Sequence, residues 1–265
     1  MPNSKAKFYY RSYIDMDVTG YSLSGDYTTP ANAVDRNKLT FTSTDGYSTD
    51  GDSVDFVADM DYDRSIDTLV LKSNLKTFTI YIWDENVTGT GGEDYVELET
   101  YSSNDSEFLV IELDETIQTS KIKITATHTI TENEEKKIYL FEITKKIDEM
   151  YLEDISIEKK WAKAKFENIY GGSVQVIKYP NHGKVEIELD FKNLNDNEGD
   201  FTAYKAIKDQ MLIDSINVYL YFSDTYDLLG KEAYYLVNDL EDYLSDPAGS
   251  SMTEGINGSM KLLEC

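Results

Sequence analysis

Short runs in which every second residue is apolar restrict the fold of this chain more than any other feature. In SVDFVADM, residues 53–60, Val54, Phe56 and Ala58 lie on one face of the expected strand. FTIYIWD, residues 78–84, repeats this alternation. Period-two alternation is typical of strands with one buried face, and the Asp-Gly, Gly-Gly and Asn-Asp pairs between runs are typical of turns. Other runs of β character are KFYYRSYI (7–14), DTLVLKS (67–73), YVELETY (95–101), EFLVIELD (107–114), KIKITATHTI (121–130) and KKIYLFEITKKI (136–147). The pattern predicts an antiparallel β-sandwich with no helix before residue 148.

The pattern changes near Asp148, where we expect a second domain to begin. Strands are predicted in QVIKYP (175–180), KVEIELDF (184–191), INVYLYF (216–222), EAYYLVNDL (232–240) and INGSMKLLE (256–264). One helix is predicted from Phe201 to Leu212, with Asp200 as its N-cap and with Phe201, Tyr204, Ile207 and Met211 on one face. The predicted fold is therefore mostly β, with a β-sandwich over residues 1–147 and a smaller α+β domain, with an antiparallel sheet and one or two helices, over residues 148–265.

The stretch from Ser24 to Thr44 carries a short motif in front of a strand of the form xVxFxxD. It resembles the discoidin or coagulation-factor C-type family of galactose-binding-like sandwiches, in which a "PAxNAxDGxxxTxWxS" segment opens the domain. The corresponding residues are Pro30, Ala31, Asn32, Ala33, Asp35, Thr40, Phe41 and Ser43. The resemblance covers about residues 7–147 and implies a galactose-binding-like jelly roll.

This chain departs from the family pattern at two positions of the motif. Arg36 stands where the family has Gly, and Phe41 stands where it has Trp. The small residues Ala31 and Ala33 are interpreted as packing a loop under the sandwich, and Asp35 as a turn former. We therefore expect the stretch to be a corner of the fold first, with ligand binding as the alternative.

The second part loosely resembles tail or baseplate proteins of tailed bacteriophages, in architecture alone. Those proteins combine a curved sheet with one or two helices and often end in a strand such as GSMKLLE, residues 258–264 here. The resemblance implies a structural role in a virion.

Charge and cysteine content exclude several classes of protein. Fifty acidic residues against twenty-five basic ones give a formal net charge of −25, which disfavours nucleic-acid and anionic-membrane partners because both need a basic face. The single cysteine, Cys265, excludes a disulfide framework and a cysteine-based zinc site. No basic segment followed by an apolar run is present at the start, so the expected setting is a virion assembled in the cytoplasm of the host.

Catalytic patterns are missing from the sequence. The two histidines are His128, in a Thr-rich strand, and His182, in a Pro-Asn-His-Gly turn, and neither position favours a general base. There is no G-x-S-x-G elbow, and Gly171-Gly172-Ser173 lacks the lysine of a phosphate loop. A pair of carboxylates for glycoside hydrolysis stays open, because some pair is close by chance in so acidic a chain. We predict a protein that is not an enzyme.

An Asp-rich loop is the candidate metal site. Carboxylates at this density offer hard oxygen ligands for calcium, although the EF-hand spacing is not met. The alternative is that the Asp-Gly pairs are ordinary turns and no cofactor is bound. The four candidate ligands are Asp45, Asp50, Asp52 and Asp55.

Tyrosine occurs twenty-one times, and it is enriched at recognition and assembly surfaces. Candidates for stacking on a sugar ring are Tyr47, Trp83, Tyr95 and Tyr101, and the alternative is that they form cross-strand pairs or face another subunit. The strands that contain Tyr219 and Tyr235 are so apolar that one helix covers them only in part, which predicts that another subunit covers the rest.

Two functions therefore follow from the sequence. The first is a structural component of a bacteriophage virion, a tail or baseplate ring protein whose partners are other virion proteins and copies of itself. The alternative is a carbohydrate-binding module that recognises a surface glycan.

Overall fold

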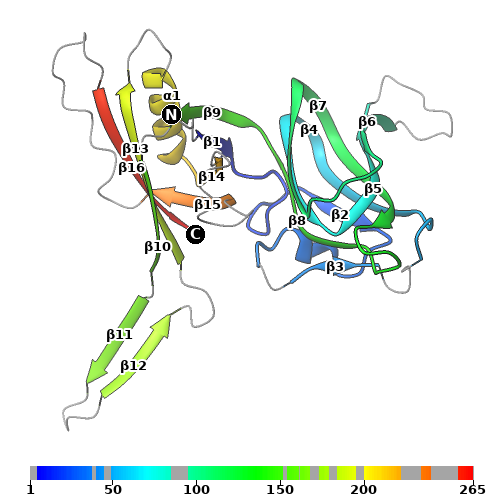
Figure 1. Ribbon diagram of the computed structural model, residues 1–265, viewed down its shortest axis with the longest axis horizontal. Helices are drawn as coiled ribbons and strands as arrows, with labels where there is room; N and C mark the ends of the chain where they lie inside the picture. Colours follow the sequence, from blue (N-terminus) through cyan, green and yellow to red (C-terminus); the bar gives the residue numbers. More distant parts are fainter. Residues whose placement is uncertain are drawn as a thin grey trace. The chain divides into compact units, whose positions relative to one another are not determined.

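A computed structural model of the 265-residue chain describes residues 5–37, 40–44, 49–84, 95–151, 154–160, 162–167, 173–178, 184–194, 200–221, 234–239 and 256–264. The fold is mostly β, with antiparallel sheets and, in these residues, a single α-helix (Figure 1). The chain forms two compact units. The sandwich unit is Ser12–Lys145, and the second unit joins Met1–Arg11 to Lys146–Cys265.

The sandwich unit contains one hydrogen-bonded sheet in the strand order β3-β8-β4-β7-β5-β6, with β2 added beside β4. A short 3-10 helix, η1, spans Pro30–Ala33. The strands are β2 (Ser22–Gly25), β3 (Thr42–Ser43), β4 (Val54–Ser73), β5 (Leu75–Trp83), β6 (Tyr95–Tyr101), β7 (Phe108–Thr129) and β8 (Lys137–Thr144).

Two very long strands, β4 and β7, allow this sheet to fold back on itself. Their pairing register shifts between Asp59 and Arg64 and again between Ile66 and Thr68. Such bulges bend a strand, so the first half of β4 pairs with β2 while its second half pairs with β8. The sequence predicts two separate strands in place of β4, at 53–60 and 67–73, and two in place of β7, at 107–114 and 121–130. Both predictions are wrong, because the pairing of β4 with β7 continues on both sides of the bends and each pair of segments is one strand.

The core of the sandwich unit comes from the alternating apolar positions. Phe56, Phe78, Ile80, Ile124 and Phe141 are all buried in one cluster. Phe56 meets Phe141 edge to face, with ring centroids 5.7 Å apart. The predicted inward faces of these strands are confirmed by this cluster.

The second unit is built on an antiparallel sheet in the order β10-β13-β16-β15-β14-β1-β9. Strands β11 and β12 form a separate two-stranded hairpin. The strands are β1 (Lys5–Tyr10), β9 (Lys146–Tyr151), β10 (Asp154–Lys160), β11 (Ala162–Glu167), β12 (Ser173–Lys178), β13 (Lys184–Leu194), β14 (Ile216–Tyr221), β15 (Tyr234–Asp239) and β16 (Ile256–Glu264).

Helix α1 (Asp200–Met211) covers part of this sheet, as the sequence predicts. Tyr204, Ile207 and Met211 are buried in the same cluster as Ile187 and Val218 of the sheet. The three helical residues follow the i, i+3, i+7 spacing of one helix face, which explains why this segment is a helix and not a strand.

The first strand of the chain lies in the second unit, which corrects its predicted place in the sandwich. Strand β1 pairs with β14 on one side and with β9 on the other, with Tyr9 opposite Lys146 in the β9 ladder. The sandwich unit is therefore inserted between two paired strands of the second unit. An apolar strand such as KFYY satisfies either sheet, because alternation predicts a buried face and not a partner.

None of the helices in the described ranges has the length and apolar character needed to cross a membrane.

Candidate functional site

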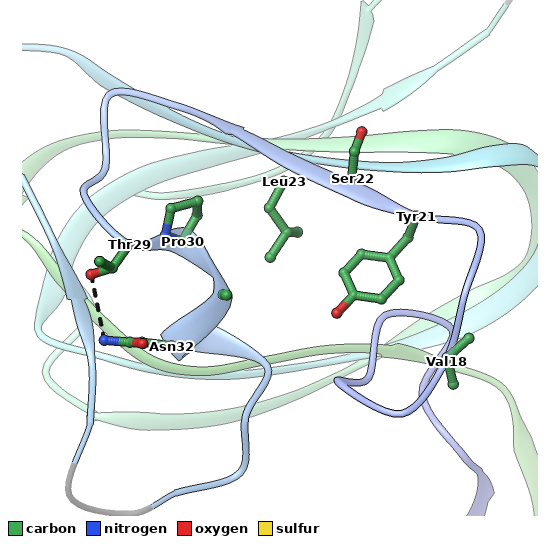
Figure 2. Close-up of a pocket in the computed structure, with 8 residues that line it drawn as sticks. Val18, Tyr21, Ser22, Leu23, Thr29, Pro30 and Asn32 are labelled. Carbon is green, nitrogen blue, oxygen red and sulfur yellow. Dashed lines mark hydrogen bonds between the residues drawn. The ribbon is translucent and has the colours of Figure 1, made fainter.

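A pocket of about 500 Å³ opens on the sandwich unit, between the segment leading into β2 and the 3-10 helix η1 (Figure 2). Figure 2 shows Leu23 between Pro30 on the η1 side and the ring of Tyr21 on the other. The residues that line the pocket are Val18, Tyr21, Ser22, Leu23, Thr29, Pro30, Ala31 and Asn32.

The first wall runs from Val18 to Leu23, and a turn at Asp15 sets its start. The backbone carbonyl of Asp15 accepts a hydrogen bond from the amide of Val18 at 2.8 Å. The Asp15 carboxylate accepts a second from the amide of Asp17 at 3.1 Å, which is the local bond that favours Asp in turns. Leu23 then enters β2 and packs against the core.

The second wall is η1 with the residue before it. Pro30 occupies the first turn, where its fixed φ suits a helix start and its missing N–H costs nothing. Thr29 precedes it in the left-handed region at φ 48°, which is rare for a β-branched residue. Strain of this kind is concentrated at functional sites. The side-chain amide of Asn32 donates to the carbonyl of Phe41 at 3.0 Å and so fixes the wall from outside.

The lining is neutral, although the chain is strongly acidic. None of the lining residues carries a formal charge. Burial raises the pKa of the Tyr21 phenol above its ordinary value, and the nearby Asp15 carboxylate adds to the effect. The phenol is therefore uncharged at neutral pH and can act as both donor and acceptor.

Arg36 connects the start of the first wall, at Asp15, with the segment that follows the second wall. Its Nε donates to Oδ2 of Asp15 at 2.7 Å, and its Nη2 lies 2.9 Å from Oε1 of Glu142 on β8. Asp15 and Glu142 are each 1% exposed. Arg36 has φ 55°, so it adopts the left-handed conformation for which the family motif has Gly. The departure seen in the sequence thus marks a buried ion cluster.

Three of the four predicted calcium ligands lie in the described residues. Asp45 lies outside the described residues. Asp50 accepts hydrogen bonds from the amide and hydroxyl of Thr129, at 3.2 and 3.4 Å, and Asp55 accepts from the hydroxyl of Thr125 at 2.6 Å. Asp52 is exposed. Within the described ranges, no group of three or more acidic, histidine or cysteine side chains is placed to hold a metal ion.

Lys136 supplies a positive charge beside this loop. It is 0% exposed, and its ammonium donates to the carbonyl of Thr49 at 3.2 Å. Burial lowers the pKa of Lys136 below its ordinary value, and the carboxylates of Asp50 and Asp52 oppose that change. The ammonium group therefore lies close to two of the predicted metal ligands.

The predicted aromatic residues belong to the β5–β6 ladder, where they form cross-strand pairs. Trp83 and Tyr95 meet edge to face at 5.1 Å, while Tyr101 stacks on buried Phe78 at 4.7 Å. Tyr47 lies outside the described residues. Lysines add to the first pair, because the ammonium of Lys121 is 5.1 Å from the Trp83 ring centroid and that of Lys123 is 4.3 Å from the Tyr95 centroid.

The two tyrosines of the second unit differ in position. Tyr219 on β14 is half-buried and pairs with Lys7 and Tyr234. Tyr235 on β15 is opposite Val218 in the β14–β15 ladder.

The histidines show no catalytic arrangement in the described part. His128 Nδ1 lies 2.9 Å from the hydroxyl of Thr127, and His182 lies outside the described residues.

Sequence reasoning named part of this pocket and missed the rest. Pro30, Ala31 and Asn32 were in the motif, interpreted as a corner of the fold, whereas Val18, Tyr21 and Leu23 follow no pattern that marks a site. The Arg in place of Gly was the one available signal for the ion cluster beneath.

Comparison with known proteins gives matches among solved structures alone. No family model and no curated protein matches the chain. Solved structures similar to it include the family 32 carbohydrate-binding module of Clostridium perfringens NanJ in complex with galactose. It is 12% identical, and the match covers 48% of this chain and 94% of that module at a TM-score of 0.40.

Two further modules give similar values. Chitosan-binding module 1 of a Paenibacillus sp. IK-5 chitosanase/glucanase is 10% identical, covering 51% of this chain and 98% of that module, at a TM-score of 0.41. The family 32 carbohydrate-binding module of Streptococcus pneumoniae EndoD is 13% identical, covering 51% and 99%, at a TM-score of 0.40. The similarity concerns about half of this chain and identifies no binding residue.

Proposed function

We propose that the sandwich unit binds a neutral saccharide in the pocket between Val18 and Asn32. The observation that carries the proposal is the pocket itself, in which apolar surface and neutral hydrogen-bonding groups face the same space. Its volume of about 500 Å³ lies in the range typical of small-molecule sites and accommodates one or two sugar rings.

The lining suits the two kinds of surface that a sugar presents. A sugar ring has apolar C–H faces, which pack against Tyr21, Leu23 and Pro30 in this arrangement. Its hydroxyl groups form hydrogen bonds with the phenol of Tyr21, whose oxygen points toward the η1 wall in Figure 2. Left-handed Thr29 fixes the direction of that wall.

Charge favours a neutral ligand. The chain has a formal net charge of −25, and no cation lines the pocket to bind a sugar carboxylate or sulfate. An acidic saccharide is repelled by the field of the protein and finds no compensating contact there.

The proposed role is binding without a reaction. Glycoside hydrolysis needs two carboxyl groups flanking the bond, and none of the lining residues is acidic. An assay that detects saccharide turnover by the purified chain would contradict this part of the proposal.

A glycan array probed with the full-length chain tests the proposal. We expect neutral saccharides to give signals, with galactose as the first probe in solution. Tyr21→Ala should weaken binding by about tenfold, because an aromatic ring that packs on a sugar face supplies on the order of 1.5 kcal/mol. Tyr62→Ala is the matched control, since Tyr62 is an exposed tyrosine of the same unit that does not line the pocket.

Two outcomes would remove the proposal. One is an array with no saccharide signal for the wild-type chain. The other is a Tyr21→Ala variant that binds as well as Tyr62→Ala.

A second candidate function is subunit assembly through the second unit, in a virion ring or another particle. Leu212 and Ile213, directly after α1, are 70% and 79% exposed, and adjacent exposed apolar side chains favour a contact with another chain. Sedimentation velocity at rising salt should show association, because salt screens the repulsion between acidic chains. Ile213→Lys should abolish it, and a wild type that stays monomeric at all salt concentrations would count against assembly.

A further inference from the structure

The two walls of the pocket are separate segments joined by residues 24–28, and their separation also depends on contacts outside that connection. The first wall begins after the turn at Asp15, and the second ends at Ala33, three residues before Arg36. A pocket recognises a rigid sugar only when the distance between its walls is fixed.

The Arg36 side chain makes the contacts that such a link requires. Its Nε–H donates to Asp15 at 2.7 Å, and its other end reaches Glu142 at 2.9 Å. The Nε–H hydrogen bond fixes the direction of the Asp15 carboxylate, while Glu142 is held by the charge of the same guanidinium. Beneath the first wall, the hydroxyl of Ser12 accepts from the amide of Ile143 at 3.1 Å, beside Glu142 on the same strand.

The backbone at Arg36 shows that this link has a cost. A non-glycine residue at φ 55° is disfavoured, and Gly would fit the position without strain. Keeping an arginine there is reasonable only when its side chain contributes more than the strained backbone loses.

We propose that Arg36 is a positioning residue, which sets the separation of the two pocket walls by joining Asp15 to the end of the η1 segment and anchoring both to β8. The inference rests on the proposed saccharide site for its functional meaning. The link itself can be measured without any saccharide.

Hydrogen exchange of the full-length chain, followed by mass spectrometry, tests the link. Arg36→Lys keeps the positive charge and loses the Nε–H donor. Backbone amides in residues 16–23 and 29–36 should exchange about tenfold faster in this variant, while amides of β7 at residues 121–126 keep the wild-type rate. Ile124→Val, a buried change on β7, is the control for general loss of stability.

Asp15→Asn provides a second variant, in case Arg36→Lys does not fold. The asparagine oxygen can still accept from the amide of Asp17, whereas its amide group cannot accept from the Arg36 Nε–H. The same two wall segments should lose protection. Wall segments that exchange at the wild-type rate in the folded variant, or acceleration spread evenly over the unit as in Ile124→Val, would overturn the proposal.

The glycan array distinguishes the positioning role of Arg36 from the proposed saccharide binding. On the array, Arg36→Lys should give signals about tenfold weaker than wild type, and unchanged signals would overturn the positioning role. If the wild type binds no saccharide at all, the proposed function fails, and hydrogen exchange still decides whether Arg36 holds the walls.

Discussion

Arg36 and Lys136 are both cations of the sandwich unit that lie beside its carboxylates, and Arg36 is 19% exposed whereas Lys136 is 0% exposed. Arg36 contacts two buried acids through separate nitrogens, whereas Lys136 donates to a backbone carbonyl and has Asp50 and Asp52 near it. The Arg36 cluster connects the turn at Asp15, the end of the η1 segment and β8. Lys136 contacts the loop at Thr49.

The difference shows that the density of acidic residues does not mark the candidate site in this chain. The loop with the most carboxylates already has an ammonium group beside it, and the pocket lies where the carboxylates are few and buried. If the burial of the carboxylates beside each cation decides how much that cation contributes, replacing the cations should lower stability in a definite order.

The largest effect is expected for Arg36→Met. The variant leaves Asp15 and Glu142 buried without their cation, so the free energy of unfolding of the sandwich unit should fall by about 3–5 kcal/mol. Urea unfolding followed by the fluorescence of Trp83, in a Trp161→Phe background, reports on this unit alone because the chain has two tryptophans. Adding Glu142→Gln should restore part of the loss, and a decrease below about 1 kcal/mol would break the contrast with Lys136.

A smaller effect is expected for Lys136→Gln. The change removes the hydrogen bond to Thr49 and leaves Asp50 and Asp52 without the nearby charge, which should cost about 1–3 kcal/mol in the same assay. A loss equal to that of Arg36→Met would show that the two clusters contribute alike.

The same variant tests the calcium hypothesis. A bound cation stabilises the folded state in proportion to the logarithm of its concentration above Kd. We expect millimolar calcium to leave the wild-type melting temperature unchanged and to raise that of Lys136→Gln, with magnesium as the control. A wild-type increase specific to calcium would instead support a metal site among Asp45, Asp50, Asp52 and Asp55.

Tyr27 is a buried residue outside both cation clusters, and its replacement by Phe should stabilise the protein. Its ring is 6% exposed, and its hydroxyl has no hydrogen-bond partner among the described residues. Tyr27→Phe removes an unsatisfied group and should raise the free energy of unfolding by about 1 kcal/mol at neutral pH. A decrease would mean that the hydroxyl is satisfied in solution.

The pH dependence of this variant gives a second measurement. Burial raises the pKa of Tyr27 above 10.0, and the charges of Asp26 and Asp55 add to the change. As pH rises through 10, the unfolded chain releases this proton and the folded chain keeps it, so stability falls with pH. Tyr27→Phe should show a shallower fall than wild type.

The smallest effect is expected for Lys121→Gln. Lys121 pairs with Asp59 at 2.6 Å, but about a third of each side chain is exposed, so the pair should contribute about 0.2–1 kcal/mol. The difference from wild type should shrink in 0.5 M salt, as expected for charges that water already screens. A larger, salt-independent loss would show that burial is not what separates Arg36 from the other cations.

Much of the fold could be predicted from local pattern, because alternation fixes which residues face the core. The predicted strand at 95–101 matches β6 at both ends, and the predicted helix matches α1 within one residue. The bends in β4 could not be predicted, because Asp61 and its exposed neighbours resemble a turn while the ladder continues around them.

The candidate site was less predictable, because its contacts join distant parts of the chain. Asp15 and Glu142 are far apart in sequence, and no spacing rule relates them to Arg36. The acids of the Asp-rich loop were visible at once, but the lysine beside them comes more than eighty residues later. Composition therefore pointed to the loop, and only the fold revealed the pocket.

The insertion of the sandwich unit between β1 and β9 has a consequence for the order of folding. Pairing Tyr9 with Lys146 while Ser12–Lys145 is unfolded closes a loop of roughly 130 residues. Closing such a loop costs about 3 kcal/mol more than closing a hairpin turn. The cost disappears once the insert has folded, because the amide of Tyr13 then donates to Ile143 at 2.9 Å and brings the two ends together. We therefore expect the sandwich unit to fold first and the sheet of the second unit to gain β1 afterwards.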